Sequence, residues 1–243
     1  MKYYIGVDDT DSLENRGTGF RAREMGRLMT EKGICTLQMV ARHQLLVDPR
    51  IPYTSHNSSA SLVVESEREA DMIEFCRNFL YAESAPGSDA GLCIAIESMV
   101  SDSILAWGNM AKKDLLFYDD ALKTAENAGI FLEGLVGEKI GVIGALAAVG
   151  LRKGGNDGRV LWMKNLRETN GVYSPEQVCE ILAINRVLNT DFKEIPAQSI
   201  VSLGEWTRPV LRNNETVLFV EKTSTKILEY YVTAREFTKR ISD

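Results

Sequence analysis

The chain has 243 residues, of which 44% are hydrophobic and 26% are charged, and its formal net charge is −6. This length and composition are typical of a globular protein with one large domain or two smaller ones. The net negative charge disfavours non-specific binding of nucleic acid, because Lys and Arg supply most of that affinity. The four cysteines form no CxxC pair and there are two histidines, which excludes a zinc ribbon and any site with three histidine ligands.

The sequence contains no apolar run that approaches the roughly 20 residues needed to span a bilayer. The N-terminal stretch MKYYIGVDD lacks the apolar segment and the small-residue cleavage site of a signal peptide. We therefore expect a cytoplasmic protein with no membrane partner.

Expected strands and helices alternate through about residue 168. The expected strands cover residues 2–7, 34–47 (one or two strands, broken near 41–43), 61–65 and 92–97. The expected helices cover residues 20–32, 67–81, 104–112 and 118–127, the last ending at Gly129, and a glycine-rich turn runs into a short helix over 138–150. This alternation predicts an α+β or layered α/β domain over residues 1–168.

The rest of the chain has the pattern of a smaller, β-rich α+β domain, expected over residues 169–243. A strand over 159–163 comes before it, and a helix begins at Pro175 with Ser174 as its N-cap. Short strands are expected within AQSIV, TRPVL, TVLFVEK and KILEYYVTA.

The most informative motif follows the first expected strand and reads DDTDS, with GTG shortly after it. Asp8, Asp9 and Asp11 place three carboxylates at a strand end, and Mg²⁺ prefers such oxygen ligands. The stretch Gly17-Thr18-Gly19 stands just before a helix N-terminus, where free N–H groups and the helix dipole favour an anion. Together they predict a metal and phosphate site.

The same motif is compatible with two alternatives. A solvated loop with Asx turns would account for one aspartate, although three beside GTG favour a function. A phosphatase with an Asp nucleophile is the second alternative, which the order of residues fits less well. No Walker A motif occurs in the chain.

A second motif runs from Gly137 through Gly141 to Gly144 and into ALAAVG. Such glycines let backbone approach a phosphate closely, but they suit tight helix packing equally well, and spacing does not separate the two. Lys139 is the candidate cation for contacting a phosphate here, and the alternative is that it is a solvated surface lysine.

A third stretch, RIPYTSHNSSA over residues 50–60, is expected to be a polar loop that enters the strand beginning at Ser61. His56 and Asn57 are able to contact a ligand, but such residues more often hold their own loop, which is the interpretation favoured here.

Several of these segments together resemble the archaeal agmatidine synthase (TiaS) family. The resemblance rests on IGVDDTDS followed by GTG, then RIPYTSHNSSASL, PGSDAGL and IGVIGALAAVG, in the family's order and over about residues 1–165. That family modifies the wobble cytidine of an isoleucine tRNA, and its kinase-like domain uses ATP to phosphorylate the cytidine before agmatine displaces the phosphate.

The resemblance implies an ATP site with Mg²⁺. Asp8, Asp9 and Asp11 match the family's metal and phosphate-handling residues, and Thr18 stands where the family has a phosphorylated threonine. The other residues expected to bind the nucleotide are Thr10, Ser12, Gly17, Gly19, Lys139, Gly141 and Gly144.

The sequence also departs from the family's pattern. The family's loop after I-P-Y usually carries Lys, Arg and a G-N-G-like turn, whereas residues 54–59 read TSHNSS, and its threonine-rich turn is replaced by Gly17-Thr18-Gly19. No segment matches its OB-fold or its Cys-paired zinc ribbon. We therefore expect no direct tRNA binding by this chain alone, and a nucleotide with a small-molecule substrate or a partner protein as its ligands.

These observations lead to one main prediction and two alternatives. The main prediction is an ATP- and Mg²⁺-dependent phosphoryl-transfer enzyme that activates a small or partner-delivered substrate. The first alternative is a nucleotide-binding regulatory module without turnover, which the altered 54–59 loop supports. The second is a structural protein, which Asp8, Asp9, Asp11 and Thr18 together disfavour. The acceptor substrate and the oligomeric state stay open, with a homo-oligomer among the options.

Overall fold

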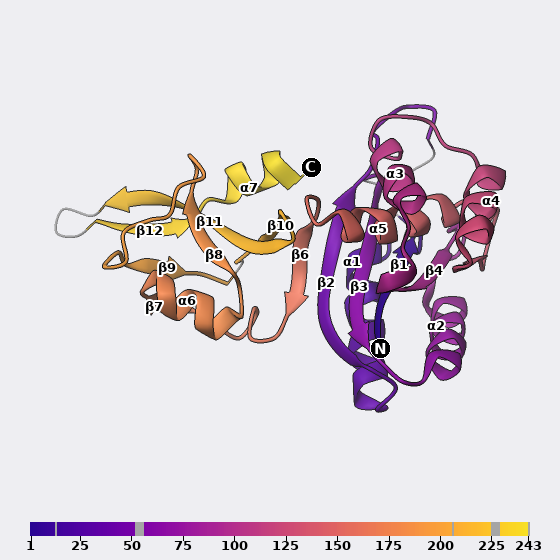
Figure 1. The fold of residues 1–243 in the computed structure, drawn as a ribbon, viewed down its shortest axis with the longest axis horizontal. Helices are drawn as coiled ribbons and strands as arrows, with labels where there is room; N and C mark the ends of the chain where they lie inside the picture. The colour runs from indigo at the N-terminus through magenta and orange to yellow at the C-terminus, as the bar shows by residue number, and fades with distance from the viewer. Residues whose placement is uncertain (13, 52–55, 206, 225–228, 243) are drawn as a thin grey trace. The chain divides into compact units, whose positions relative to one another are not determined.

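The computed structural model describes residues 1–12, 14–51, 56–205, 207–224 and 229–242 (Figure 1). The chain divides into two compact units, which we call unit 1 (Met1–Gly154) and unit 2 (Gly155–Asp243). The sequence predicts a domain boundary between residues 168 and 169, which is further along the chain than the division between the two units and falls inside unit 2. A functional division at that place stays a prediction.

Unit 1 is built on an antiparallel sheet with the strand order β5-β4-β1-β3-β2. Its strands are β1 (Lys2–Asp8), β2 (Thr36–Gln44), β3 (Ser58–Glu65), β4 (Gly91–Ile96) and β5 (Phe131–Gly134). Residues 3–7 of the central strand β1, YYIGV, are buried, as expected of aromatic and β-branched residues between two helical layers.

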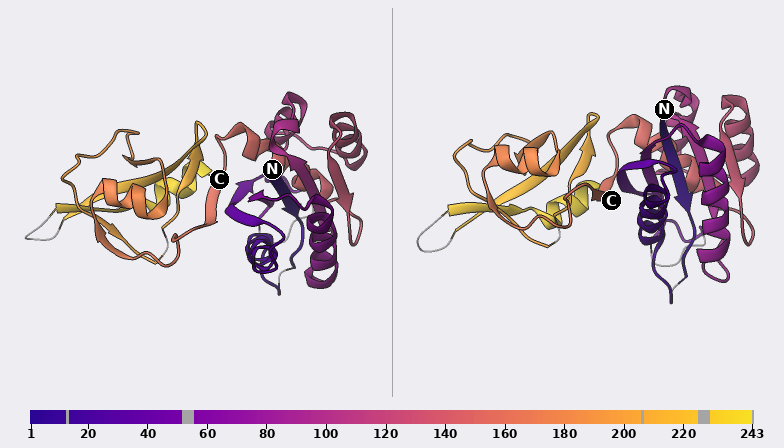
Figure 2. Two further views of the ribbon diagram at one scale, coloured as in Figure 1. Left: turned by 60° about the horizontal axis from the view of Figure 1, so that its bottom comes forward. Right: turned by 90° about the horizontal axis from the view of Figure 1, so that it is seen from below.

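Helices cover both faces of this sheet (Figure 2, left). They are α1 (Thr18–Glu31), α2 (Glu69–Glu83), α3 (Asp102–Met110), α4 (Tyr118–Ala128) and α5 (Val142–Gly154), with a short 3₁₀ turn at Glu97–Met99. Helix α1 packs on β2 and β3 and α2 on β4, whereas α5 packs on β1, β3 and β4 and is covered in turn by α3 and α4. This layered α+β arrangement confirms the expected fold class.

Helix α5 packs directly against the central strand β1 of the sheet. It reads VIGALAAVGL and is buried from Gly144 to Leu151, as required of a helix that is apolar all round. It passes so close to β1 that a Cβ on Gly6 would lie 1.9 Å from the carbonyl oxygen of Ala145. The N-terminal end of α5 therefore lies against the carboxyl end of β1.

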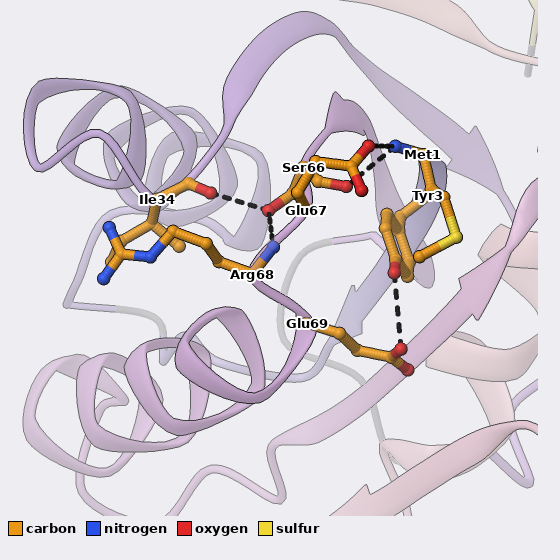
Figure 3. Close-up of polar contacts among 7 residues, drawn as sticks. All are labelled: Met1, Tyr3, Ile34, Ser66, Glu67, Arg68 and Glu69. Carbon is orange, nitrogen blue, oxygen red and sulfur yellow. Dashed lines mark hydrogen bonds and ion pairs between the residues drawn. The ribbon is translucent and has the colours of Figure 1, made fainter.

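The opposite end of the sheet is tied together by Ser66, which follows β3 (Figure 3). Its hydroxyl donates to the carbonyl of Ile34 at 2.7 Å and accepts from the backbone N–H of Arg68 at 2.9 Å. Its backbone N–H and carbonyl both bond to Met1, at 2.9 Å each. These contacts join the start of β1, the α1–β2 turn and the start of α2.

The strands of unit 2 are paired in the order β6-β10-β11-β12-β9-β7, and β8 pairs with β11 in parallel. They are β6 (Arg159–Met163), β7 (Gly171–Tyr173), β8 (Arg186–Asn189), β9 (Val201–Leu203), β10 (Val210–Arg212), β11 (Glu215–Ser224) and β12 (Glu229–Thr233). The helices of this unit are α6 (Pro175–Leu182) and α7 (Arg235–Ser242). Phe219 of β11 lies in its core, and Phe237 of α7 packs at 5.0 Å from it between ring centroids.

Most expected elements of unit 1 are present, with two corrections. Strand β2 is not broken near 41–43, because it pairs with β3 without interruption from Met39 to Gln44 and its irregularity lies between Leu37 and Met39. Ser58–Ala60, expected as loop, belong to β3, and residues 52–55 of that loop lie outside the described residues. Strands β5, β7 and β8 and helix α7 were not expected from the sequence.

Across the described residues, none of the helices combines the length and the apolar character that crossing a membrane requires.

Candidate functional site

The carboxylates that follow β1 come from a strand end that faces α5. Side chains alternate along a strand, so Asp8 points to the same face as Gly6, which lies against α5. A Cβ on Gly144 would lie 1.8 Å from Asp8 Oδ2. The second glycine-rich motif thus serves close packing, and it does so at a carboxylate.

Asp9 turns the chain away from the sheet. Its φ of 52° is in the left-handed region, which Asp and Asn enter more readily than most residues. The backbone N–H of Asp89, just before β4, bonds to the Asp9 carboxylate. In the antiparallel pairing of β1 with β4, Asp8 stands opposite Gly91, and this register brings Asp89 beside Asp9.

Asp89 also holds the turn that leads into α5. Its side-chain Oδ1 accepts from the backbone N–H of Glu138, and its carbonyl accepts from the N–H of Gly141 at 2.9 Å. One residue therefore links Asp9 to the 137–141 turn.

Asp11 is connected to the N-terminus of α1 through Thr18. The Thr18 hydroxyl donates to Asp11 Oδ1 at 3.1 Å, and it accepts from the Thr10 backbone N–H at 3.3 Å and from the Thr10 hydroxyl at 3.1 Å. Gly17 is the N-cap of α1, and a Cβ there would lie 3.5 Å from Asp11 Oδ2. The carboxylate of Asp11 therefore lies directly at the helix start.

The pKa values of the carboxylates reflect burial and mutual repulsion. Burial, followed by the charges of Asp9 and Asp11, raises the pKa of Asp8 well above its ordinary value. Burial, followed by the charges of Asp89 and Asp11, raises the pKa of Asp9 to about 6. The charges that act on both groups are other carboxylates, so a bound cation would relieve the repulsion.

A pocket of about 440 Å³ opens beside these groups. Its polar lining includes Asp8, Asp9 and Asp11 with backbone of Gly141 and Gly144. The rest of the lining is largely apolar and comes from Leu45, Ile51, Ala111, Leu115, Leu116, Phe117, Tyr118, Ile140 and Ile143. Arg50, His56, Asn57, Ser58 and Asp114 complete it. A pocket that joins carboxylates and glycine backbone to an apolar wall suits a ligand with a charged end and a flat or apolar end.

Several predicted residues lie near this pocket without lining it. Thr10 and Thr18 are buried behind Asp11. Ser12 accepts a hydrogen bond from the Asn15 side chain at 2.8 Å, and Gly19 lies in the first turn of α1. Lys139 is exposed, in a left-handed turn with φ 64°. A role for these residues in nucleotide binding stays a prediction.

Sequence reasoning missed Asp89 and the apolar wall. Asp89 lies just before a buried strand, within the segment PGSDAGL, and a carboxylate at a strand end is the sequence feature that could have indicated it. His56 and Asn57, which were expected only to hold their own loop, line the pocket, and Asn57 also donates to the Leu46 carbonyl at 2.7 Å.

The donor set fits a magnesium ion that is shared with a ligand better than one held by protein alone. Within the described part of the chain, no group of three or more His, Cys, Asp or Glu side chains is arranged to hold a metal ion. Mg²⁺ commonly takes one or two carboxylates and completes its shell with water and substrate phosphates. Mutually repelling carboxylates on a pocket wall match that second arrangement.

Comparison with known proteins shows a fold likeness to solved structures of TiaS and of a tRNA fluorescent labeling enzyme. No family model matches the sequence, and no curated protein matches it. Among solved structures, a tRNA fluorescent labeling enzyme has 26% sequence identity and a TM-score of 0.55, over 62% of this chain and 36% of that chain. The complex of TiaS with an isoleucine tRNA and ATP has 24% identity and a TM-score of 0.56, with the same coverage.

A further complex, TiaS with the same tRNA, AMPCPP and agmatine, has 24% identity and a TM-score of 0.55. The chain therefore matches little more than a third of the length of these proteins. These comparisons establish a TiaS-like fold over 62% of the chain, as the sequence motifs predicted.

Proposed function

We propose that unit 1 is an ATP- and Mg²⁺-dependent, kinase-like phosphotransferase that activates a small or partner-delivered substrate. The observation that carries this proposal is the pocket itself, in which Asp8, Asp9 and Asp11 meet the backbone of Gly141 and Gly144. ATP-bearing structures with the same fold support the choice of nucleotide.

The carboxylates have the role of placing the metal and the phosphates. Asp8, Asp9 and Asp11 would hold Mg²⁺ in some combination, and the ion, when bound, neutralises charge on the transferred phosphoryl group. The triphosphate would lie near Gly141 and Gly144, where the positive end of the α5 dipole favours an anion.

In the proposed enzyme Thr18 would accept a phosphoryl group within the protein, which is the modification that the TiaS resemblance implies. Its hydroxyl already donates to Asp11 at 3.1 Å, so Asp11 is placed to take the proton as the oxygen attacks phosphorus. The bond from phosphorus to the leaving nucleotide oxygen would break as the new one forms.

A second function is supported by the burial of the same residue. Thr18 is 6% exposed and does not line the pocket, so a phosphoryl group reaches it only if the α1 N-terminus moves. A nucleotide-binding regulatory module that holds ATP without turnover needs no such movement.

The test is intact-protein mass spectrometry after incubation with ATP and Mg²⁺, together with analysis of the adenine nucleotides. A gain of one phosphate at Thr18 with ADP formed, or with AMP and one equivalent of free phosphate formed, supports the enzyme, and Thr18→Val should abolish the gain. Asp9→Asn should abolish turnover, whereas Asp71→Asn, on the exposed surface of α2, serves as the matched control. Bound but intact ATP supports the regulatory module, and absence of binding contradicts both functions.

A further inference from the structure

Phe117 is an aromatic side chain left in solvent at the wall of the pocket. It is 66% exposed, although it lines the pocket together with the half-buried Leu115, Leu116 and Ile143. An exposed large apolar side chain that is part of a concave surface is more informative than one on a convex surface, because a ligand is able to bury it.

Phe117 also stands at a chain position that usually carries a polar side chain. It is the N-cap of α4, with no side-chain capping bond. Ser, Thr, Asp and Asn are preferred there because their side chains accept from the first free N–H groups of the helix. Such local violations are expected where a residue serves a ligand.

We propose that Phe117 is the stacking platform for the adenine base of the bound nucleotide. This inference rests on the proposed function, because it takes the phosphates and metal to lie at Asp8, Asp9 and Gly144. A nucleotide has one anionic end and one flat aromatic end, and the lining of the pocket has carboxylates with glycine backbone and an apolar wall. The flat base matches the apolar wall, and Phe117 is the more exposed of the two aromatic rings in that wall.

Stacking on an aromatic ring also predicts how much affinity the base contributes. Removal of an aromatic platform costs about 1–3 kcal/mol per stacked base, or roughly 5- to 150-fold in affinity. Tyr118 follows Phe117 and is half-buried, so it offers less open ring surface.

The experiment compares two probes on the full chain by calorimetric titration with Mg²⁺ present. One probe is the non-hydrolysable nucleotide AMP-PNP, and the other is inorganic tripolyphosphate, which has the charged end but no base. Phe117→Ala should weaken AMP-PNP binding by roughly 5- to 150-fold and leave tripolyphosphate binding unchanged. Phe117→Tyr should keep the affinity within about twofold, and Tyr81→Ala, which removes an aromatic ring that is 54% exposed on α2, should change neither.

A proton spectrum of the bound nucleotide separates stacking from plain apolar contact. The adenine H2 and H8 resonances should shift upfield on the wild-type protein, and this shift should disappear with Phe117→Leu, which keeps an apolar side chain but no ring. Unchanged resonances and unchanged AMP-PNP affinity in Phe117→Ala would overturn the stacking proposal and leave the proposed function standing. A wild-type protein that binds neither probe would overturn the proposed function and the stacking proposal together.

Discussion

At the scale of single residues, the fold holds the Asp9 carboxylate in a partly buried position beside other carboxylates, where its negative charge is unfavourable. Its pKa is raised to about 6 by burial and by the charges of Asp89 and Asp11, whereas an unfolded aspartate titrates near 3.9. Between these two values the folded protein binds more protons than the unfolded chain, so the stability from this group decreases as pH rises through the window. Asp8, whose pKa is shifted in the same direction, adds to that decrease.

We therefore predict that Asp9→Asn stabilises the nucleotide-free protein at pH 7. The expected gain in the free energy of unfolding is about 1–2 kcal/mol, after allowance for the solvent that still reaches the side chain. Asn tolerates the left-handed backbone, so the substitution isolates the charge. Urea unfolding at pH 7 and pH 4 measures the effect, which should nearly vanish at pH 4. An equal gain at both pH values would show that the carboxylate charge is not the cause.

At the scale of elements, the contact between β1 and α5 determines whether the site exists. Helix α5 approaches β1 at Gly6 and reaches Asp8 at Gly144, where no side chain fits. The same approach places Gly141 and Gly144 on the pocket wall. The close packing of α5 and the glycine lining of the pocket wall are therefore two consequences of one set of glycines.

For this contact we predict that Gly144→Ala destabilises the protein by roughly 2 kcal/mol and removes Mg²⁺-nucleotide binding. The added methyl would overlap Asp8 Oδ2, so the helix or the carboxylate has to move. Thermal unfolding and nucleotide titration measure the two effects. Gly204→Ala is the control, because a Cβ there meets no atom within 4 Å. Normal nucleotide binding by Gly144→Ala would contradict this placement of the site.

The far end of the same sheet provides a test of stability without function. Ser66→Ala leaves the Ile34 carbonyl and the Arg68 N–H without their side-chain partner, and we expect a loss of about 1–2 kcal/mol. The pocket lies at the other end of β3, where Ser58 lines it, so Ser66 is not part of its wall. The affinity of Ser66→Ala for nucleotide should therefore equal that of the wild-type protein. Chemical denaturation with nucleotide titration checks both statements, and Ser101→Ala on the exposed surface is the control. A loss of affinity in Ser66→Ala would show that the two ends of the sheet are coupled.

At the scale of the whole molecule, the described pocket belongs to unit 1 alone, since its lining runs from Asp8 to Gly144. We predict that Mg²⁺-nucleotide slows hydrogen exchange in peptides that cover residues 8–19, 111–118 and 137–145, because ligand binding stabilises the folded state of the segments that contact it. Peptides from Gly155 onward should be unaffected. Mass spectrometry of exchange measures this, and strong protection in unit 2 would mean that the second unit contributes to the site.

Much of the local structure was predictable because its signals lie in neighbouring residues. Helix α4 ends at Gly129, as predicted, and this glycine has the left-handed conformation. Ser174 caps α6, and its side chain and that of Gln177 bond reciprocally to the backbone. The carboxylate cluster was equally visible, since Asp8, Asp9 and Asp11 follow a strand within a few positions. Caps, strand ends and charge clusters depend on short-range geometry, which sequence spacing reports directly.

The completion of the site was decided only by tertiary structure. Asp89 reaches Asp9 because β4 pairs with β1 in one register, and Phe117 reaches the pocket because the α3–α4 connection lies beside α5. Helix α7 was not predicted because its apolar side chains, Phe237 and Ile241, pack against core residues that lie far away in the sequence. Strand pairing and helix packing join residues far apart in the chain, so local patterns determined the charged end of the pocket and long-range packing determined its apolar wall.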